Sequence, residues 1–260
     1  VDFDLVKNIF LKNKIEICFH LAAQAIVKNA FDSPRETLLT NIVGTINALE
    51  AARCSTHLKS FVVASTTHVY GDNKELPYLE SFYPRPTRPY ETSKICADIL
   101  AQTYFHTYNL PVAIARFTNA YGPGDFNFSR VVPKAMLSVI KKRNPEITGG
   151  TAVRDYLYVK DAVSAYLLLA ENLDKEKIKG EIFNFGSGER VSAIGMTKKI
   201  IEVSGDKKLN VIVHSSRPGS NEINKQYVSI GKAKKVLGWS PQYSIKDGLR
   251  ETYKWYRKNI

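Results

Sequence analysis

The sequence contains little cysteine and no long apolar run. Its three cysteines, Cys18, Cys54 and Cys96, are odd in number, lie in expected strands or helices and lack the paired spacing of zinc ligands. A disulfide framework and a metal site are therefore not expected. We expect the three cysteines to be reduced thiols in the core. No apolar stretch approaches the roughly 20 residues that span a bilayer, and the polar, acidic start Val1–Asp4 differs from a signal peptide. We expect a cytoplasmic protein without a membrane partner.

Acidic residues are scarce relative to basic ones. Lys and Arg number 37 against 25 Asp and Glu, which gives a formal net charge of +12. An excess of this kind indicates nucleic-acid binding when the basic residues cluster. Here the clusters are short, as at 141–143 and 207–208, and no stacking aromatics are interleaved with them. We interpret them as solvated helix faces, and no nucleic-acid partner is expected.

Apolar strands alternate with amphipathic helices along the chain, and there are no internal repeats. This alternation predicts an α/β fold with a parallel sheet and helices on both of its faces. Helices are predicted over about 34–53, 90–108, 131–143 and 245–258. The second of them ends before Asn109 and Pro111, which are typical stop signals.

Three apolar runs end in small or polar residues. The run at 16–21 ends in Ala22 and Ala23, which are small enough to let a ligand approach the backbone. The run at 61–64 leads into Ser65, Thr66, Thr67 and His68, and the run at 112–117 leads into a turn-rich loop at 119–124. Open α/β sheets bind ligands at the carboxyl ends of their strands. The three segments therefore predict a binding site at one edge of the sheet.

Tyr90 and Lys94 are the most informative pair, because positions four apart lie on one face of a helix. A phenol normally keeps its proton until pH about 10, but a nearby ammonium favours the phenolate, so that tyrosine can act as a base near neutrality. A Thr66 hydroxyl could bond to the same substrate oxygen. The bare Tyr-x-x-x-Lys pattern is more often an ordinary helix-surface pair, and only its context favours a catalytic one.

With these residues in view, the chain resembles the extended short-chain dehydrogenase/reductase family, in particular its nucleotide-sugar epimerases and dehydratases. The matching segments occur in the family's order: His20–Ala23, Asn41–Thr45, Ser65–Gly71, Tyr90–Lys94, Arg116–Gly124, Arg154–Val159 and Arg217–Gly219. Segments 127–133 and 222–239 look most similar to the CDP-glucose 4,6-dehydratase branch. The resemblance implies a Rossmann-like, doubly wound parallel sheet with a smaller, discontinuous substrate-binding lobe. It also implies a homodimer, although Ile95, Ile99 and Leu100 suit subunit contacts and packing on the sheet equally well.

The family's glycine-rich phosphate turn is missing from this sequence. Because there is no initiator Met and Val1–Asp4 resembles the exit of the family's third strand, we expect an amino-terminally truncated fragment that binds NAD poorly. The NAD-binding domain is expected to comprise 1–118 and about 155–187. The substrate-binding lobe is expected to comprise about 119–154 and 188–260, with the ligand between the two.

The resemblance also implies a role for each matched residue. Tyr90 would remove the proton of the sugar C4 hydroxyl while hydride passes to NAD, and Lys94 would hold the nicotinamide ribose and lower the pKa of Tyr90. Thr66 would polarise the C4 oxygen. Cofactor-lining residues would be Leu21, Ala22, Ala23, Asn41 and Phe117, and residues that bind the nucleotide-diphosphate hexose would be Thr67, Asn119, Arg154, Tyr158 and Arg217. NADP stays open as an alternative cofactor, since that choice normally rests on residues upstream.

The two residues after Thr66 separate the possible activities. Related dehydratases carry an acid and a base there, whereas this chain has Thr67 and His68. Neither replaces a carboxylic acid well, although His68 could act as the C5 base or have no catalytic role. A 4-epimerase needs neither group, so a nucleotide-sugar 4-epimerase is the leading hypothesis and a 4,6-dehydratase of the CDP-glucose type the second. A non-catalytic cofactor-binding regulator or scaffold is the third.

Overall fold

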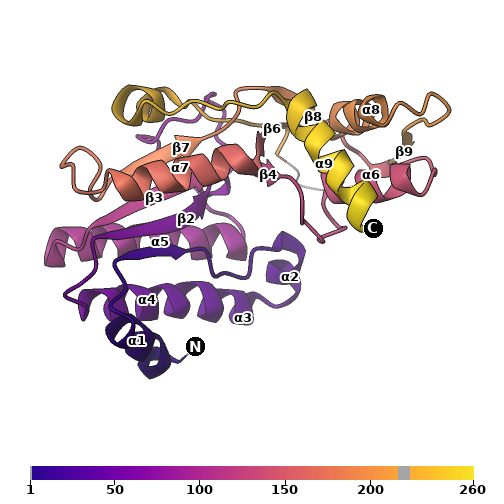
Figure 1. Cartoon of the computed structure of the whole chain (residues 1–260). Helices are drawn as coiled ribbons and strands as arrows, with labels where there is room; N and C mark the ends of the chain where they lie inside the picture. The colour runs from indigo at the N-terminus through magenta and orange to yellow at the C-terminus, as the bar shows by residue number, and fades with distance from the viewer. Residues whose placement is uncertain (1, 216–222) are drawn as a thin grey trace. The chain divides into compact units, whose positions relative to one another are not determined.

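The computed structural model describes residues 2–215 and 223–260 (Figure 1). The chain divides into two compact units, each assembled from three segments. Unit 1 comprises Val1–Phe117, Ser164–Phe185 and Ser229–Trp239, and unit 2 comprises Thr118–Val163, Gly186–Val228 and Ser240–Ile260. Arg217, a predicted substrate-binding residue, lies outside the described residues. No helix in the described ranges is both long enough and apolar enough to cross a bilayer.

A four-stranded parallel sheet forms the centre of unit 1, in the order β1-β2-β3-β7. The strands are β1 (Ile17–His20), β2 (Ser60–Thr66), β3 (Val112–Phe117) and β7 (Ile182–Phe185). The two middle strands are buried almost throughout, as expected for a parallel sheet covered on both faces. This confirms the predicted α/β fold with a parallel sheet.

Helices cover both faces of this sheet (Figure 1). On one face, α4 (Gly44–Arg53) and α5 (Pro89–Tyr108) enclose a core with β2 and β3, and α1 (Phe3–Lys12) packs against α4. On the other face, Tyr166 of α7 (Val159–Glu171) packs against Phe19 and Phe117. Side chains of alternate residues in a strand point to opposite faces, so Val112 and Ile114 face α5 while Phe117 faces α7.

The predicted helix at 34–53 is interrupted. It consists of α3 (Pro34–Leu38), a π-helical turn at Leu39–Val43 and then α4, and a short α2 (Val27–Asp32) precedes it. The predicted helix at 90–108 is α5, which ends at Asn109 in a left-handed conformation with φ 53°. Asparagine tolerates this conformation better than most residues, which explains the stop there.

Unit 2 combines a small mixed sheet with helices. Strand β6 (Val153–Tyr158) pairs in parallel with β4 (Asn119–Tyr121) and β10 (Lys225–Gln226), and antiparallel with β8 (Arg190–Ser192). A separate parallel pair joins β5 (Glu146–Thr148) to β9 (Ile212–His214).

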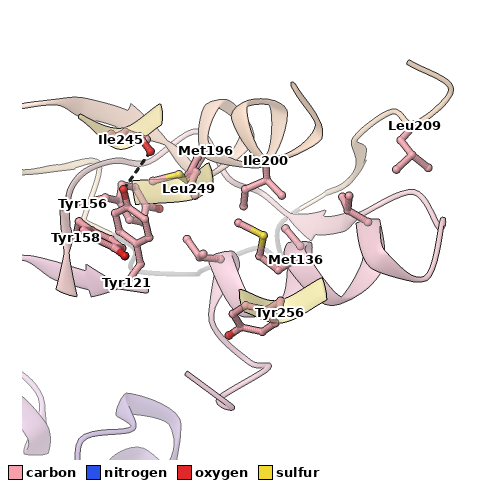
Figure 2. Packing of buried hydrophobic residues seen from close by; sticks show 13 residues of the cluster. Tyr121, Met136, Tyr156, Tyr158, Met196, Ile200, Leu209, Ile245, Leu249 and Tyr256 are labelled. Atoms are coloured by element: carbon pink, nitrogen blue, oxygen red, sulfur yellow. Dashed lines mark hydrogen bonds between the residues drawn. The ribbon is translucent and has the colours of Figure 1, made fainter. Parts of the chain in front are cut away.

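Unit 2 contains the helices α6 (Val131–Ile140), α8 (Ala193–Ser204) and α9 (Ile245–Asn259). α6 and α9 differ slightly in length from the ranges expected for them, and α8 was not predicted. Figure 2 shows the core that they share with the strands, rich in tyrosine and methionine. In it, the Tyr121 hydroxyl donates to the carbonyl of Ile245 at 3.2 Å.

The unit boundaries differ from the expected ones at two places. We expected 155–187 beside the first segment, but β6 and residues 159–163 belong to unit 2 because β6 pairs with β4, β8 and β10. We expected 229–239 in the second lobe, but this segment belongs to unit 1. There the Trp239 indole donates to the Ser164 hydroxyl at 3.0 Å and packs edge-on against Phe185.

Candidate active site

The first turn of α5 is held in place by Glu91, whose side chain is 2 % exposed. Its carboxylate accepts hydrogen bonds from the backbone amides of Thr87 and Arg88 at 2.9 and 3.2 Å. Pro89 occupies the first helical turn, where its missing N–H removes no helical bond. The start of α5 is therefore fixed, and Tyr90 is buried in that first turn with an exposed fraction of 9 %.

Lys94 lies one turn further along α5 and is also buried. Its ammonium donates a hydrogen bond to the carbonyl of Ala64 in β2 at 2.9 Å. Burial lowers the pKa of Lys94, and the nearby carboxylate of Asp98 acts against that shift. Because Ala64 lies two residues before Thr66, this bond fixes the lysine at the carboxyl end of β2.

The hydroxyl-bearing segment forms a tight turn immediately after β2. Thr66 ends the strand and its side-chain oxygen accepts from the amide of His68 at 3.3 Å, while Thr67–Tyr70 form a single 3₁₀ turn. The ring of His68 lies edge-on to that of Tyr90, with the centroids 6.3 Å apart. The structure thus brings the turn and the start of α5 together, as the strand-end pattern predicted.

The segment after β1 carries the predicted cofactor-lining residues. Leu21 and Ala22 are exposed and Ala23 is half-buried, which leaves the backbone open to a ligand. At the end of β1, His20 makes a 3.0 Å hydrogen bond to the Thr45 hydroxyl. Burial, followed by the charge of Lys94, lowers the pKa of His20 to about 4, so this imidazole is neutral near neutral pH.

Asn41 is placed by the π-helical turn and uses its side-chain amide within the protein. Its oxygen accepts from the amide of Gln24 at 2.7 Å, and its nitrogen donates to the Gln24 carbonyl at 3.0 Å and to the Ser93 hydroxyl at 2.8 Å. Ser93 in turn donates to the carbonyl of Tyr90 at 2.8 Å. Asn41 therefore joins the loop after β1 to the first turn of α5, a connection that the sequence did not reveal. Its predicted contact with the cofactor stays a prediction.

Phe117, another predicted cofactor-lining residue, is a core residue at the end of β3. It is 7 % exposed and stacks on Phe185 with ring centroids 5.1 Å apart.

Three predicted substrate-binding residues among the described part of unit 2 lie on two paired strands. Asn119 begins β4 and is in register with Tyr156 of β6, and Arg154 is half-buried near the start of β6. Tyr158 is 1 % exposed, and its hydroxyl donates to Glu251 at 2.8 Å. Its described contacts are those of a core side chain, so its substrate role stays a prediction.

Asp155, next to Arg154, is a buried carboxylate whose hydrogen bonds were not predicted from the sequence. It accepts from the amide and the hydroxyl of Ser187, both at 2.8 Å, and from the amide of Gly188 at 3.3 Å. Burial raises its pKa, and these hydrogen bonds act against that shift. A Cβ at Gly186 would lie 2.4 Å from its Oδ2, so only glycine fits there. The one sequence signal was its place inside the Arg-Asp-Tyr motif.

Metal ligation has no candidate among residues 2–215 and 223–260, where no group of three or more His, Cys, Asp or Glu is arranged to hold an ion.

A match to a known family covers nearly the whole chain. Residues 1–252 match GDP-mannose 4,6 dehydratase, and the chain belongs to this family. It is 32% identical over 267 residues to the dTDP-D-glucose 4,6-dehydratase of Homo sapiens, which spans all of this chain and 73% of the human protein. It is 29% identical to the UDP-glucuronate 4-epimerase of Thermodesulfobacterium geofontis, over all of this chain and 78% of that protein.

Solved structures with the same fold include both kinds of enzyme. A UDP-glucose 4-epimerase from Thermotoga maritima, with UDP-glucose, superposes with a TM-score of 0.90 at 32% identity, over 99% of this chain and 82% of that one. A dTDP-glucose 4,6-dehydratase from Streptomyces venezuelae, with NAD bound, gives 0.87 at 27% identity, over 99% and 77%. The predicted resemblance is confirmed, and the chain is an enzyme of the nucleotide-sugar epimerase and dehydratase class.

Proposed function

We propose that this protein is an NAD-dependent nucleotide-sugar 4-epimerase that acts through a 4-keto-hexose. The observation that carries the proposal is the meeting of three elements in unit 1. The Thr66–His68 turn contacts Tyr90 through His68, and Lys94 of the same helix is anchored to the end of β2. A phenol, a hydroxyl and an amine gathered at one strand end can together take and return the proton of a secondary alcohol.

The residues of unit 1 fit the nicotinamide half of a dinucleotide. Ala22 and Ala23 leave an open backbone at the carboxyl end of β1, and Lys94 offers a donor beside the end of β2. Bound NAD would accept hydride from the sugar C4. In this proposal Tyr90 takes the C4 hydroxyl proton, Thr66 polarises the oxygen, and Asn119, Arg154 and Arg217 hold the substrate diphosphate. NADP is the alternative cofactor.

Thr67 and His68 favour epimerisation over dehydration. Loss of water from C5 and C6 needs an acid as well as a base, and neither a hydroxyl nor a neutral imidazole donates a proton as a carboxylic acid does. Relatives that are epimerases, such as those from Thermodesulfobacterium geofontis and Thermotoga maritima, support epimerisation as the reaction. The second candidate is an NDP-hexose 4,6-dehydratase of the CDP-glucose type. The matching family and the human relative support 4,6-dehydration as the reaction, whereas the CDP-glucose type stays a prediction.

The test is mass spectrometry of the products formed from CDP-, UDP-, GDP- and dTDP-hexoses with added NAD. A 4-epimerase leaves the mass of its substrate unchanged and yields a second stereoisomer. Loss of one water would overturn the epimerase in favour of the dehydratase. If no hexose is consumed and Tyr90→Phe leaves the biological effect intact, the protein is a non-catalytic regulator or scaffold.

A cytoplasmic location and a homodimer complete the proposal. The free state of Cys18, Cys54 and Cys96 supports a reducing compartment. Ile95 is buried, whereas Ile99 on the same helix is 56 % exposed and available to a second subunit. Light scattering of the purified protein tests the dimer.

A further inference from the structure

Arg116 of β3 is a fully charged side chain with an exposed fraction of only 1 %. Its Nε lies 2.8 Å from Asp98 Oδ2, and its Nη1 donates to the hydroxyl of Tyr70 at 2.9 Å. The guanidinium carbon also lies 4.8 Å from the centre of the Tyr70 ring. Burying a guanidinium is unfavourable unless its charge is paired and its N–H groups are hydrogen-bonded. The positions of Asp98 and Tyr70 around Arg116 are therefore closely constrained.

The partners of Arg116 come from the two elements that carry the proposed catalytic side chains. Asp98 lies one helical turn after Lys94 in α5 and is itself buried. Tyr70 is the last residue of the 3₁₀ turn that contains Thr67 and His68. One guanidinium therefore bonds to both α5 and the turn.

A third element fixes the far end of this network. The Tyr70 hydroxyl donates to Asn184 Oδ1 of β7 at 2.8 Å. Asn184 is held from both sides, since its side chain donates to the carbonyl of Tyr78 at 3.2 Å and its amide donates to Glu80 at 2.9 Å. The Tyr70 hydroxyl thus accepts a hydrogen bond from Arg116 and donates one to Asn184 at the same time, which fixes its position.

We propose that Asp98, Arg116 and Tyr70 are positioning residues, which hold the Thr66–His68 turn at the correct separation from Tyr90 and Lys94. This inference rests on the proposed function. None of the three is placed to contact substrate; they act through the backbone of α5 and of the turn. Reactions that depend on oriented groups lose about a hundredfold in rate for a displacement near 1 Å, so a loosened turn lowers kcat. Substrate affinity, which depends on other residues, is kept.

A purely stabilising role makes a different prediction. Buried ion pairs are weak sources of net stability, and their replacement is often neutral when the packing is kept. If the network only stabilised unit 1, removing the Tyr70 hydroxyl would lower the melting temperature and leave the rate of the folded protein unchanged.

The test compares Tyr70→Phe with Tyr104→Phe. Tyr104 also lies in unit 1, on α5, and its hydroxyl donates to Glu50 at 3.0 Å away from the turn. We expect Tyr70→Phe to lower kcat about tenfold with KM within twofold of the parent, and Tyr104→Phe to leave both within twofold. Asp98→Asn, which keeps the shape of the side chain, is expected to lower kcat further.

Hydrogen exchange provides a readout that needs no substrate. Faster amide exchange at 66–71 in Tyr70→Phe, but not in Tyr104→Phe, is expected. Unchanged kcat together with unchanged exchange at 66–71 overturns the proposal, whatever the melting temperature. If the parent consumes no nucleotide sugar, the proposed function fails, and the exchange result alone then decides whether the network holds the turn.

Discussion

Units 1 and 2 both bury aspartates, but they use them differently. In unit 1, Asp98 pairs with Arg116, and Arg116 also bonds to Tyr70, so strand β3 connects the helix and the turn that carry proposed catalytic residues. In unit 2, Asp155 accepts from the amides of Ser187 and Gly188, and Asp161 accepts from the amides of Gln242 and Tyr243 at 2.8 and 3.2 Å. The first kind of contact sets distances between side chains, whereas the second holds the backbone of loops. Substitution of the buried Asp98 in unit 1 should therefore change the rate, and substitution of the buried Asp155 in unit 2 should change stability.

The largest effect is expected from Lys94→Met in unit 1. This change removes the ammonium that is held by the Ala64 carbonyl, and with it the charge proposed to activate Tyr90. We expect kcat/KM to fall about a thousandfold, measured with the hexose that the parent consumes. Lys59→Met is the matched control, because Lys59 is an exposed lysine of the same unit whose ammonium lies 2.7 Å from the carboxylate of the exposed Glu16. Activity of Lys94→Met within threefold of the parent would show that the buried amine has no catalytic role.

Asp155→Ala should produce the largest loss of stability in unit 2. It removes a buried acceptor from the amides of the half-buried Ser187 and the exposed Gly188, which costs about 1–3 kcal/mol. Urea unfolding measures the loss, and the exposed Asp247→Ala serves as the control. A change below about 0.5 kcal/mol, which is typical of surface positions, would contradict the role given to Asp155.

The contrast between the units also explains what the sequence could predict. Tyr90, Lys94 and the Thr66–His68 segment could be proposed from the sequence because a helix period and a strand end are local patterns. The hydrogen-bond network around Arg116 was not predicted, because its members are far apart in the sequence. Tyr70 lies 46 residues from Arg116, and Asn184 lies 114 residues from Tyr70. The unit boundary at β6 was misplaced for the same reason, since strand pairing is decided by distant segments rather than by the order of elements.

Acid should destabilise unit 1 through His20. Its pKa is lowered to about 4 in the folded protein, mainly by burial, from the ordinary value of about 6.5. The unfolded chain therefore takes up the proton first, so the stability is fully present above pH about 6.5 and is lost between that pH and about 4. Between pH 7 and 5 we expect a loss of about 1–2 kcal/mol that is absent in His20→Gln. Equal pH dependence in the two proteins would show that His20 does not titrate as described.

The smallest effect is expected from His68→Asn, and it separates the two candidate reactions. An epimerase does not need this imidazole as a base, so epimerisation should fall less than tenfold. A dehydratase that uses His68 at C5 would lose about a hundredfold or more. Product quantification by chromatography distinguishes the two outcomes.

The most direct test of the account is the rate of Tyr90→Phe measured beside that of Tyr104→Phe. Both changes remove one phenolic hydroxyl from α5, but only Tyr90 has its ring against His68 at the end of β2. We predict that Tyr104→Phe consumes its nucleotide sugar at a rate within twofold of the parent, while Tyr90→Phe is slower by about a thousandfold. Equal rates for the two variants would contradict the proposal that Tyr90 moves the proton.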